Sequence, residues 1–211
     1  MTDETIYREP QQKRSIEKKE RILAASYAQF CQNGYAQTTM NDIAKSAKVS
    51  VGTVYSYFKD KKMIFKLVYE TYVNSLEQTF ELAQYQEITS IAALEELFIR
   101  SIKDLIKLHQ DSINFQKETK MLYQIDEEVA KLSDASYQKS LDFIKEALQS
   151  TKVALRVTDF DAAAILIRVL CDGVVDQITF YPELISEKKA DQLIQETTEM
   201  LKRYLCVMNE D

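Results

Sequence analysis

The chain has 211 residues, of which 45% are apolar and 28% charged, with a net charge of −6, enough for one large or two small domains with a buried core. Three scattered cysteines and a single histidine argue against a disulfide framework and against a zinc site. The charged N-terminus and the short apolar runs predict no signal segment and no membrane span, so we expect a cytoplasmic protein without a metal or other cofactor.

Helical patterns account for almost the whole chain, and no period-2 segment or internal repeat stands out, so the prediction is an all-α fold of about nine helices. Residues 1–14 are polar, contain Pro10 and are expected to form a flexible arm. The predicted helices run from about 16 to 33, 40 to 47, 50 to 58, 60 to 83, 90 to 108, 112 to 123, 126 to 150, 158 to 181 and 186 to 208.

Local signals set the expected helix ends. Gly34 closes the first helix, and Pro182 closes the eighth. N-caps are predicted where a small polar residue precedes an apolar run, at Thr39 (paired with Asp42), Ser50, Asp60, Thr89 or Ser90, Thr158 (paired with Asp161) and Ser186.

Charge divides the chain into a basic head and an acidic body. Residues 1–66 hold 12 Lys and Arg against 7 Asp and Glu, a net of +5, and residues 67–211 hold 15 against 26, a net of −11, which sum to −6. Such a head is typical of a protein that meets a polyanion. A chance fluctuation of solvated charges explains the same numbers, because +5 is modest for a nucleic-acid binder.

The helices at 40–47 and 50–58, with a short turn between them, form the outline of a helix-turn-helix. Ile43, Ala47 and Val54 fall on the inner side, which leaves a polar outer face on the second helix. Hydroxyl and lysine side chains are typical phosphate donors, and Val51 and Thr53 suit base edges. Gly52 costs about 1 kcal/mol in a helix and suggests that a ligand approaches closely. An ordinary helical hairpin is the alternative.

The segment from Glu17 to about Tyr69 resembles the DNA-binding domain of TetR-family transcriptional regulators. The resemblance lies in an Ile-Leu-Ala helix ending in Phe-x-x-x-Gly-Tyr, followed by Thr-Thr, Ile-Ala, Val-Ser-x-Gly-Thr-Val-Tyr-x-Tyr-Phe and a lysine-rich helix start. It implies a three-helix DNA-binding domain at 15–66, with the helix-turn-helix at about 39–58, and an effector-binding and dimerisation domain at 67–211. It also implies a homodimeric bacterial repressor that binds a palindromic operator.

Carried over position by position, the resemblance implies DNA contacts at Thr39, Ser50, Val51, Gly52, Thr53, Tyr55, Tyr57 and Lys61. The turn departs from the family pattern, because Lys48 stands where Ala-Gly-Val-Ser has its glycine. A left-handed Lys48 costs on the order of 1 kcal/mol. It also places a cation near the DNA backbone, so Lys48 joins the candidates.

Beyond about Val73 the resemblance extends only to architecture, a helical body that holds an effector and forms the dimer. The helix before Pro182 is apolar over most of its circumference and is expected to be largely buried. With the last helix it would form a four-helix interface between two subunits, in which Gly173 allows a close approach; a tolerated mid-helix glycine is the alternative. The candidates for this interface are Ile165, Val169, Gly173, Ile178, Leu193 and Leu201.

A small apolar effector is the last expectation from the resemblance. Its candidate contacts are the aromatic residues Phe98, Phe115, Tyr123, Tyr137 and Phe143, with Arg168 and Asp172 as a polar handle. Aromatic residues at helical spacing are more often plain core. Arg168 and Asp172 equally suit an i,i+4 ion pair.

We therefore expect a DNA-binding transcriptional regulator, and specifically a repressor that responds to an effector. A catalytic role is not expected, because the sequence shows no nucleophile–base pair and no Gly-rich phosphate loop. The alternative is an all-α enzyme or scaffolding protein whose basic head binds a partner other than DNA.

Overall fold

A computed structural model describes residues 13–84 and 88–207, with backbone only for residues 75–84. Within these residues the chain forms nine helices and no β-strand, which confirms the all-α prediction. They are α1 (Lys13–Gln37), α2 (Met40–Ser46), α3 (Val51–Tyr57), α4 (Lys61–Gln84), α5 (Ile91–Asp111), α6 (Ile113–Ile125), α7 (Glu127–Ser150), α8 (Phe160–Phe180) and α9 (Glu187–Leu205). None of the described helices has the length and apolar character of a membrane span.

Most of the predicted caps are present. The side chains of Ser50, Ser90 and Ser186 each accept a backbone N–H three residues further on, and Asp60 does the same for Met63 at 2.8 Å. The prediction for α8 was wrong by one residue: Asp159, not Thr158, accepts the N–H of Ala162 at 3.0 Å. A carboxylate is a charged acceptor at the positive end of a helix, which favours aspartate over threonine there.

Several predicted helix ends also differ: α1 ends at Gln37 rather than 33, and α5 at Asp111 rather than 108. Helix α1 already begins at Lys13, so the arm predicted for residues 1–14 falls on residues outside the described range except for its last two. Helix α9 ends at Leu205, before the predicted 208. The reason is a single antiparallel bridge between Leu155 and Cys206, extended by a bond from the N–H of Val207 to Ala154 O at 3.0 Å.

The chain divides into two compact units. The first consists of Met1–Ser75 with Asn114–Leu132, and its core is aromatic. Phe115 lies 5.3 Å from both Phe65 and Tyr27, measured between ring centroids, and Phe30 is fully buried beside Phe65. Aromatic rings bury large apolar areas, so this core holds α1 against the start of α4 and fixes the helices between them.

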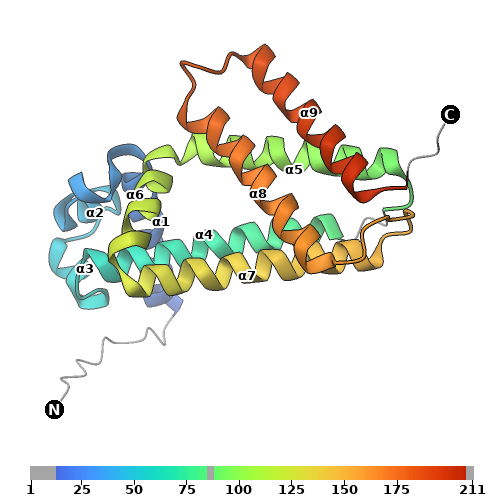
Figure 1. Cartoon of the computed structure of the whole chain (residues 1–211). Helices are drawn as coiled ribbons and strands as arrows, with labels where there is room; N and C mark the ends of the chain where they lie inside the picture. Colours follow the sequence, from blue (N-terminus) through green and yellow to red (C-terminus); the bar gives the residue numbers. More distant parts are fainter. Residues whose placement is uncertain (1–12, 85–87, 208–211) are drawn as a thin grey trace. The chain divides into compact units, whose positions relative to one another are not determined.

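The second unit consists of Leu76–Ile113 with Ser133–Asp211. Its core lies where α5, α8 and α9 pack together (Figure 1). One cluster centres on Leu94, Ile167 and Leu201, and a second on Ile102, Val175 and Ile194. The division into domains at 15–66 and 67–211 stays a prediction. The first compact unit differs from the predicted N-terminal domain, because it also contains Asn114–Leu132, which includes most of α6.

Candidate nucleic-acid interface

Helix α2 is fixed at its start by a complete capping box. The N–H of Asp42 donates to Thr39 Oγ1 at 3.2 Å, and the N–H of Thr39 donates to Asp42 Oδ2 at 2.9 Å. The Thr39 hydroxyl also donates to Asp42 Oδ2, at 2.6 Å, and this bond, together with the one from the Thr39 N–H, holds the pKa of the Asp42 carboxyl below its ordinary value. Ile43 and Ala44 are buried. The capping box therefore fixes where α2 begins, and burial fixes which side of α2 faces inward.

The turn between α2 and α3 depends on a left-handed residue. Lys48 has φ of 54°, the only non-glycine residue with positive φ among the described residues. The next N–H, that of Val49, donates to Ala44 O at 3.0 Å and closes the turn. Lys48 thus adopts the left-handed conformation considered from the sequence, at a cost on the order of 1 kcal/mol relative to a glycine.

Helix α3 presents a mixed apolar and polar face to solvent. Val54 is fully buried, whereas Val51 is 38% and Tyr55 51% exposed. Gly52 lies between them and is exposed as well. A Cβ added at Gly52 would meet only Ser50 Oγ, at 3.9 Å, so nothing within the chain requires a glycine here.

Several hydroxyl groups among the candidates already have partners. Ser50 Oγ accepts the N–H of Thr53 at 3.1 Å and lies 2.9 Å from Thr53 Oγ1. Tyr57 Oη lies 2.8 Å from Ser15 Oγ of α1. These three side chains and Thr39 therefore stabilise the local fold, whatever else they contact.

Lys61, another candidate, points inward. Its ammonium group donates to the carbonyl oxygens of Ala36 and Thr38, at 3.3 and 2.7 Å, and to that of Tyr35. It also lies 4.4 Å from the centroid of the Tyr35 ring. Burial lowers the pKa of Lys61.

The other lysines around the helix-turn-helix fall into two groups. Lys62 and Lys66 pair with Asp126 and Glu128 at the junction of α6 and α7. Lys45, Lys48 and Lys59 make no ion pair with any described residue and are exposed. Lys59 was missed by sequence reasoning, although its position directly after the buried Phe58 was a usable signal.

A helix-turn-helix whose second helix has an exposed face occurs in a known family. Residues 22–68 match the family model of the bacterial regulatory proteins, tetR family. This segment of the chain belongs to the TetR family. The chain is 41% identical over 64 residues to YhgD of Bacillus subtilis, an uncharacterized HTH-type transcriptional regulator, an alignment that spans 30% of this chain and 34% of the relative. The chain thus matches about a third of that relative's length.

Solved structures of similar proteins cover most of the chain. A candidate TetR-family regulator from Mesorhizobium loti superposes with a TM-score of 0.76 at 21% identity, over 93% of this chain and 100% of that one. SmeT, the repressor of the multidrug efflux pump SmeDEF of Stenotrophomonas maltophilia, superposes with a TM-score of 0.64 at 25% identity, over 88% and 89%. SmeT has also been solved as a triclosan complex. These likenesses show a shared fold that extends through both units.

The structure does not gather the predicted effector contacts of the chain at one place. Phe115 is fully buried in the first unit, where Tyr123 is exposed. Phe98 belongs to the core of the second unit, and Phe143 is half-buried there. Tyr137, Arg168 and Asp172 do come together: Arg168 Nε donates to Asp172 Oδ2 at 2.9 Å, and the guanidinium lies 5.1 Å from the Tyr137 ring centroid.

The predicted dimer-interface residues fall into a buried group and an exposed group. Ile178 and Leu201 are buried inside the second unit, and Leu193 is half-buried against the same core. Ile165 and Val169 are 44% and 55% exposed, and Gly173 is exposed on the same side of α8. A Cβ at Gly173 would meet nothing within 4 Å.

Proposed function

We propose that this chain is a transcriptional repressor that binds operator DNA through the exposed face of α3. One observation carries the proposal: Val51, Gly52 and Tyr55 form a solvent-exposed surface on a helix whose other side is buried. Membership of the TetR family favours this function over an all-α enzyme or scaffold. A regulator of this kind acts in the cytoplasm, where its DNA is.

Helix α3 would lie in the major groove, as the second helix of a helix-turn-helix does. Val51 and Tyr55 are its large exposed side chains and would contact base edges or thymine methyl groups. Lys48 and Lys59, just before and just after α3, have no partner in the described chain. They are suited to bind backbone phosphates on either side of the groove.

Repression through a palindromic operator requires two copies of α3, and α8 offers a surface on which two chains can associate. Ile165, Leu166 and Val169 are each between 44% and 55% exposed. A contiguous apolar patch on one helix commonly marks a protein interface. Gly173 extends the patch, and the open space around it would let a partner helix approach closely. We propose a homodimer built on this side of α8, with recognition helices about 34–36 Å apart.

Control by a small molecule would use the polar cluster between α7 and α8. Arg168 donates to Asp172 and to Ser140 Oγ, and its guanidinium faces the Tyr137 ring. An effector with an anionic or carbonyl group could replace Asp172 or Ser140 as the partner of Arg168. By linkage, an effector that weakens DNA binding is itself bound more weakly by the DNA complex, by the same factor.

The proposal is tested by selecting binding sites from random duplex DNA with the full chain, followed by titration of the selected site at several salt concentrations. The expected result is an inverted repeat whose affinity falls steeply with salt. Tyr55→Ala should abolish the enrichment, whereas Tyr123→Ala, which truncates an exposed tyrosine outside the helix-turn-helix, should not. A folded chain that enriches no sequence, with or without candidate effectors, would contradict the proposal.

A further inference from the structure

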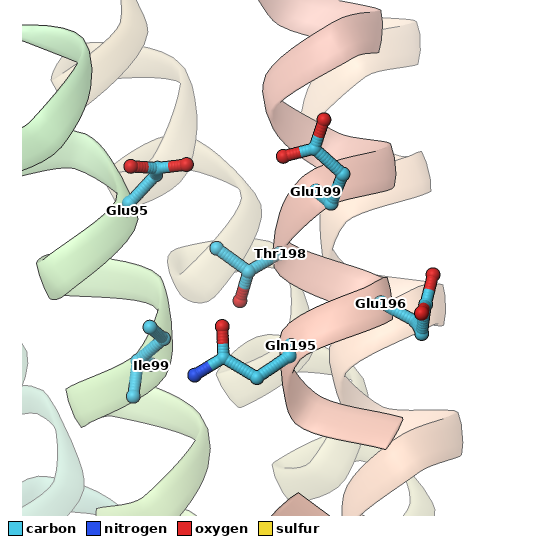
Figure 2. A pocket seen from close by; sticks show the side chains of 6 residues that line it. All are labelled: Glu95, Ile99, Gln195, Glu196, Thr198 and Glu199. Carbon is cyan, nitrogen blue, oxygen red and sulfur yellow. The ribbon is translucent and has the colours of Figure 1, made fainter. Parts of the chain in front are cut away.

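A groove between α5 and α9 in the second unit lies apart from the predicted effector residues. It has a volume of about 250 Å³ and is lined by Glu95, Ile99, Gln195, Glu196, Thr198 and Glu199. Figure 2 shows Gln195 and Thr198 projecting from α9 toward Ile99 of α5. The volume lies below the range of drug-sized pockets, so the groove suits a small ligand.

Thr198 carries a buried hydroxyl with no partner. The residue is 3% exposed, yet its Oγ1 makes no hydrogen bond to any described residue. A threonine inside a helix commonly donates to the carbonyl four residues earlier. Its neighbour Thr197 does so, to Leu193 O at 2.8 Å. Because a buried, unsatisfied hydroxyl is costly, the unused group of Thr198 points to a ligand in the groove.

The charge around this hydroxyl is negative. Three carboxylates line the groove, those of Glu95, Glu196 and Glu199, and two cations neutralise part of this charge. Lys202 Nζ contacts Glu95 Oε1 at 2.6 Å and also contacts Glu199, and Arg203 Nε lies 2.6 Å from Glu199 Oε1. Three carboxylates against two cations leave an excess of one negative charge. Glu196 makes no ion pair in the described part of the chain, and Figure 2 shows its side chain on the side of α9 that faces away from Ile99.

Lys202 places an alkyl ammonium group against Glu95 and Glu199, two of the residues that line the groove. Its pKa is raised by hydrogen bonds to Glu199 and Glu95. A metal ion fits the groove less well, because no group of three or more His, Cys, Asp or Glu among the described residues could hold one. The other acceptors that line the groove are the second Glu95 oxygen, Thr198 Oγ1 and the Gln195 amide oxygen, a set that suits an N–H donor.

We propose that the α5–α9 groove is a binding site for a small organic cation with a primary ammonium group. The ammonium donates to Glu95, Thr198 and Gln195, while the ligand's alkyl part packs on Ile99. The site shares no residue with the α3 face or with the Arg168 cluster, so this proposal does not depend on operator binding.

The test is isothermal titration of the full chain with 1,4-diaminobutane at low ionic strength. One ligand should bind per chain. Glu95→Gln should weaken binding at least tenfold, and Thr198→Val about three- to tenfold, the loss of one hydrogen bond. Thr197→Val is the matched control, because Thr197 is buried on the same helix but does not line the groove. It should leave the affinity unchanged.

Two further probes separate a built site from general attraction of cations. Tetramethylammonium carries the charge without an N–H donor, and butan-1-ol carries the alkyl part without the charge; both should bind at least tenfold more weakly than the diamine. Thr198→Val should keep or raise the melting temperature while the affinity falls, because it removes an unsatisfied hydroxyl. The proposal is overturned if the diamine does not saturate the folded chain, if Thr198→Val binds as wild type, or if tetramethylammonium binds equally well.

Discussion

Lys61 Nζ donates a hydrogen bond to Thr38 O at 2.7 Å, and so joins the first residue of α4 to the segment that follows α1. The same ammonium also binds the carbonyls of Tyr35 and Ala36. Lysine side chains commonly satisfy the free carbonyls at a helix C-terminus. The segment between these two ends contains α2 and α3, so Lys61 positions the recognition helix in addition to any contact with DNA.

We predict that Lys61→Met lowers the free energy of unfolding by about 1–3 kcal/mol, because carbonyl groups lose a charged donor. Tyr55→Ala, at an exposed position, should leave stability unchanged and remove operator binding. Urea denaturation and fluorescence anisotropy with operator DNA would measure both effects. If Lys61→Met kept full stability and lost DNA binding, Lys61 would be a direct phosphate contact instead.

Gly52→Ala should separate stability from DNA binding. A Cβ has room at this position in the free chain, and alanine is favoured over glycine in a helix by up to about 1 kcal/mol. We therefore expect a higher melting temperature together with weaker operator affinity, since the added methyl group lies where the DNA backbone or a base edge approaches. Unchanged affinity in Gly52→Ala would exclude Gly52 from the interface.

Gly34→Ala is the opposite case, because Gly34 has φ of 79° and an added Cβ would lie 3.0 Å from Glu118 Oε1. This substitution should destabilise the protein.

Lys48→Gly should stabilise the chain by about 1 kcal/mol, because it removes a side chain from a left-handed residue. It should also reduce the slope of log affinity against log salt by about 0.9, the value for one phosphate contact. Lys59→Gln serves as the comparison: it removes a cation with no described partner and should change the salt slope without the gain in stability. A salt slope that is the same in both variants and wild type would contradict the assignment of these lysines to phosphates.

The ion pairs between α4 and the α6–α7 junction predict a pH dependence of stability. A hydrogen bond from Lys62 lowers the pKa of Asp126, and one from Lys66 lowers that of Glu128. A lowered carboxyl pKa stabilises the folded state above the ordinary carboxyl range near pH 4, and this contribution is lost as the pH falls through the lowered values. The variant with both Lys62→Gln and Lys66→Gln should therefore lose less stability than wild type between about pH 6 and pH 3.

The control for this experiment is Lys131→Gln. Lys131 pairs with Glu127 within α7, and both side chains are exposed, so that pair contributes little. Urea denaturation at a series of pH values would compare the three proteins. Parallel curves for the double variant and wild type would show that the α4 ion pairs carry none of the acid sensitivity.

Val169→Asp should convert the proposed dimer to a monomer, because it places a charge in the centre of the exposed α8 patch. Met121→Asp is the matched control, since Met121 is 48% exposed on α6, in the other unit. Analytical ultracentrifugation at several concentrations would measure the association, and circular dichroism would check the fold. A dimer that persists in Val169→Asp would move the interface away from this patch.

Local patterns in the sequence were sufficient for most of the helices and for the helix-turn-helix. Thr39, Ser50 and Ser186 act as predicted, because a cap requires only an acceptor and an N–H a few residues further along the same chain. The left-handed Lys48 was foreseeable for the same reason, as it depends on the length of a turn. The cap of α8 was assigned to Thr158 instead of Asp159, because both side chains are possible acceptors and spacing alone does not decide between neighbours.

The amino-acid sequence by itself determined the all-α class, the positions of the helices and the family, because these follow from periodicity, caps and a contiguous motif. Only the tertiary structure decided which side chains are available. Lys61 lies inside a carbonyl cluster, Ile178 and Leu201 lie in a core, and the hydroxyl of Thr198 has no partner. The physical reason is that burial and hydrogen bonding depend on residues distant in sequence, such as Glu95 and Lys202, which helix packing brings together.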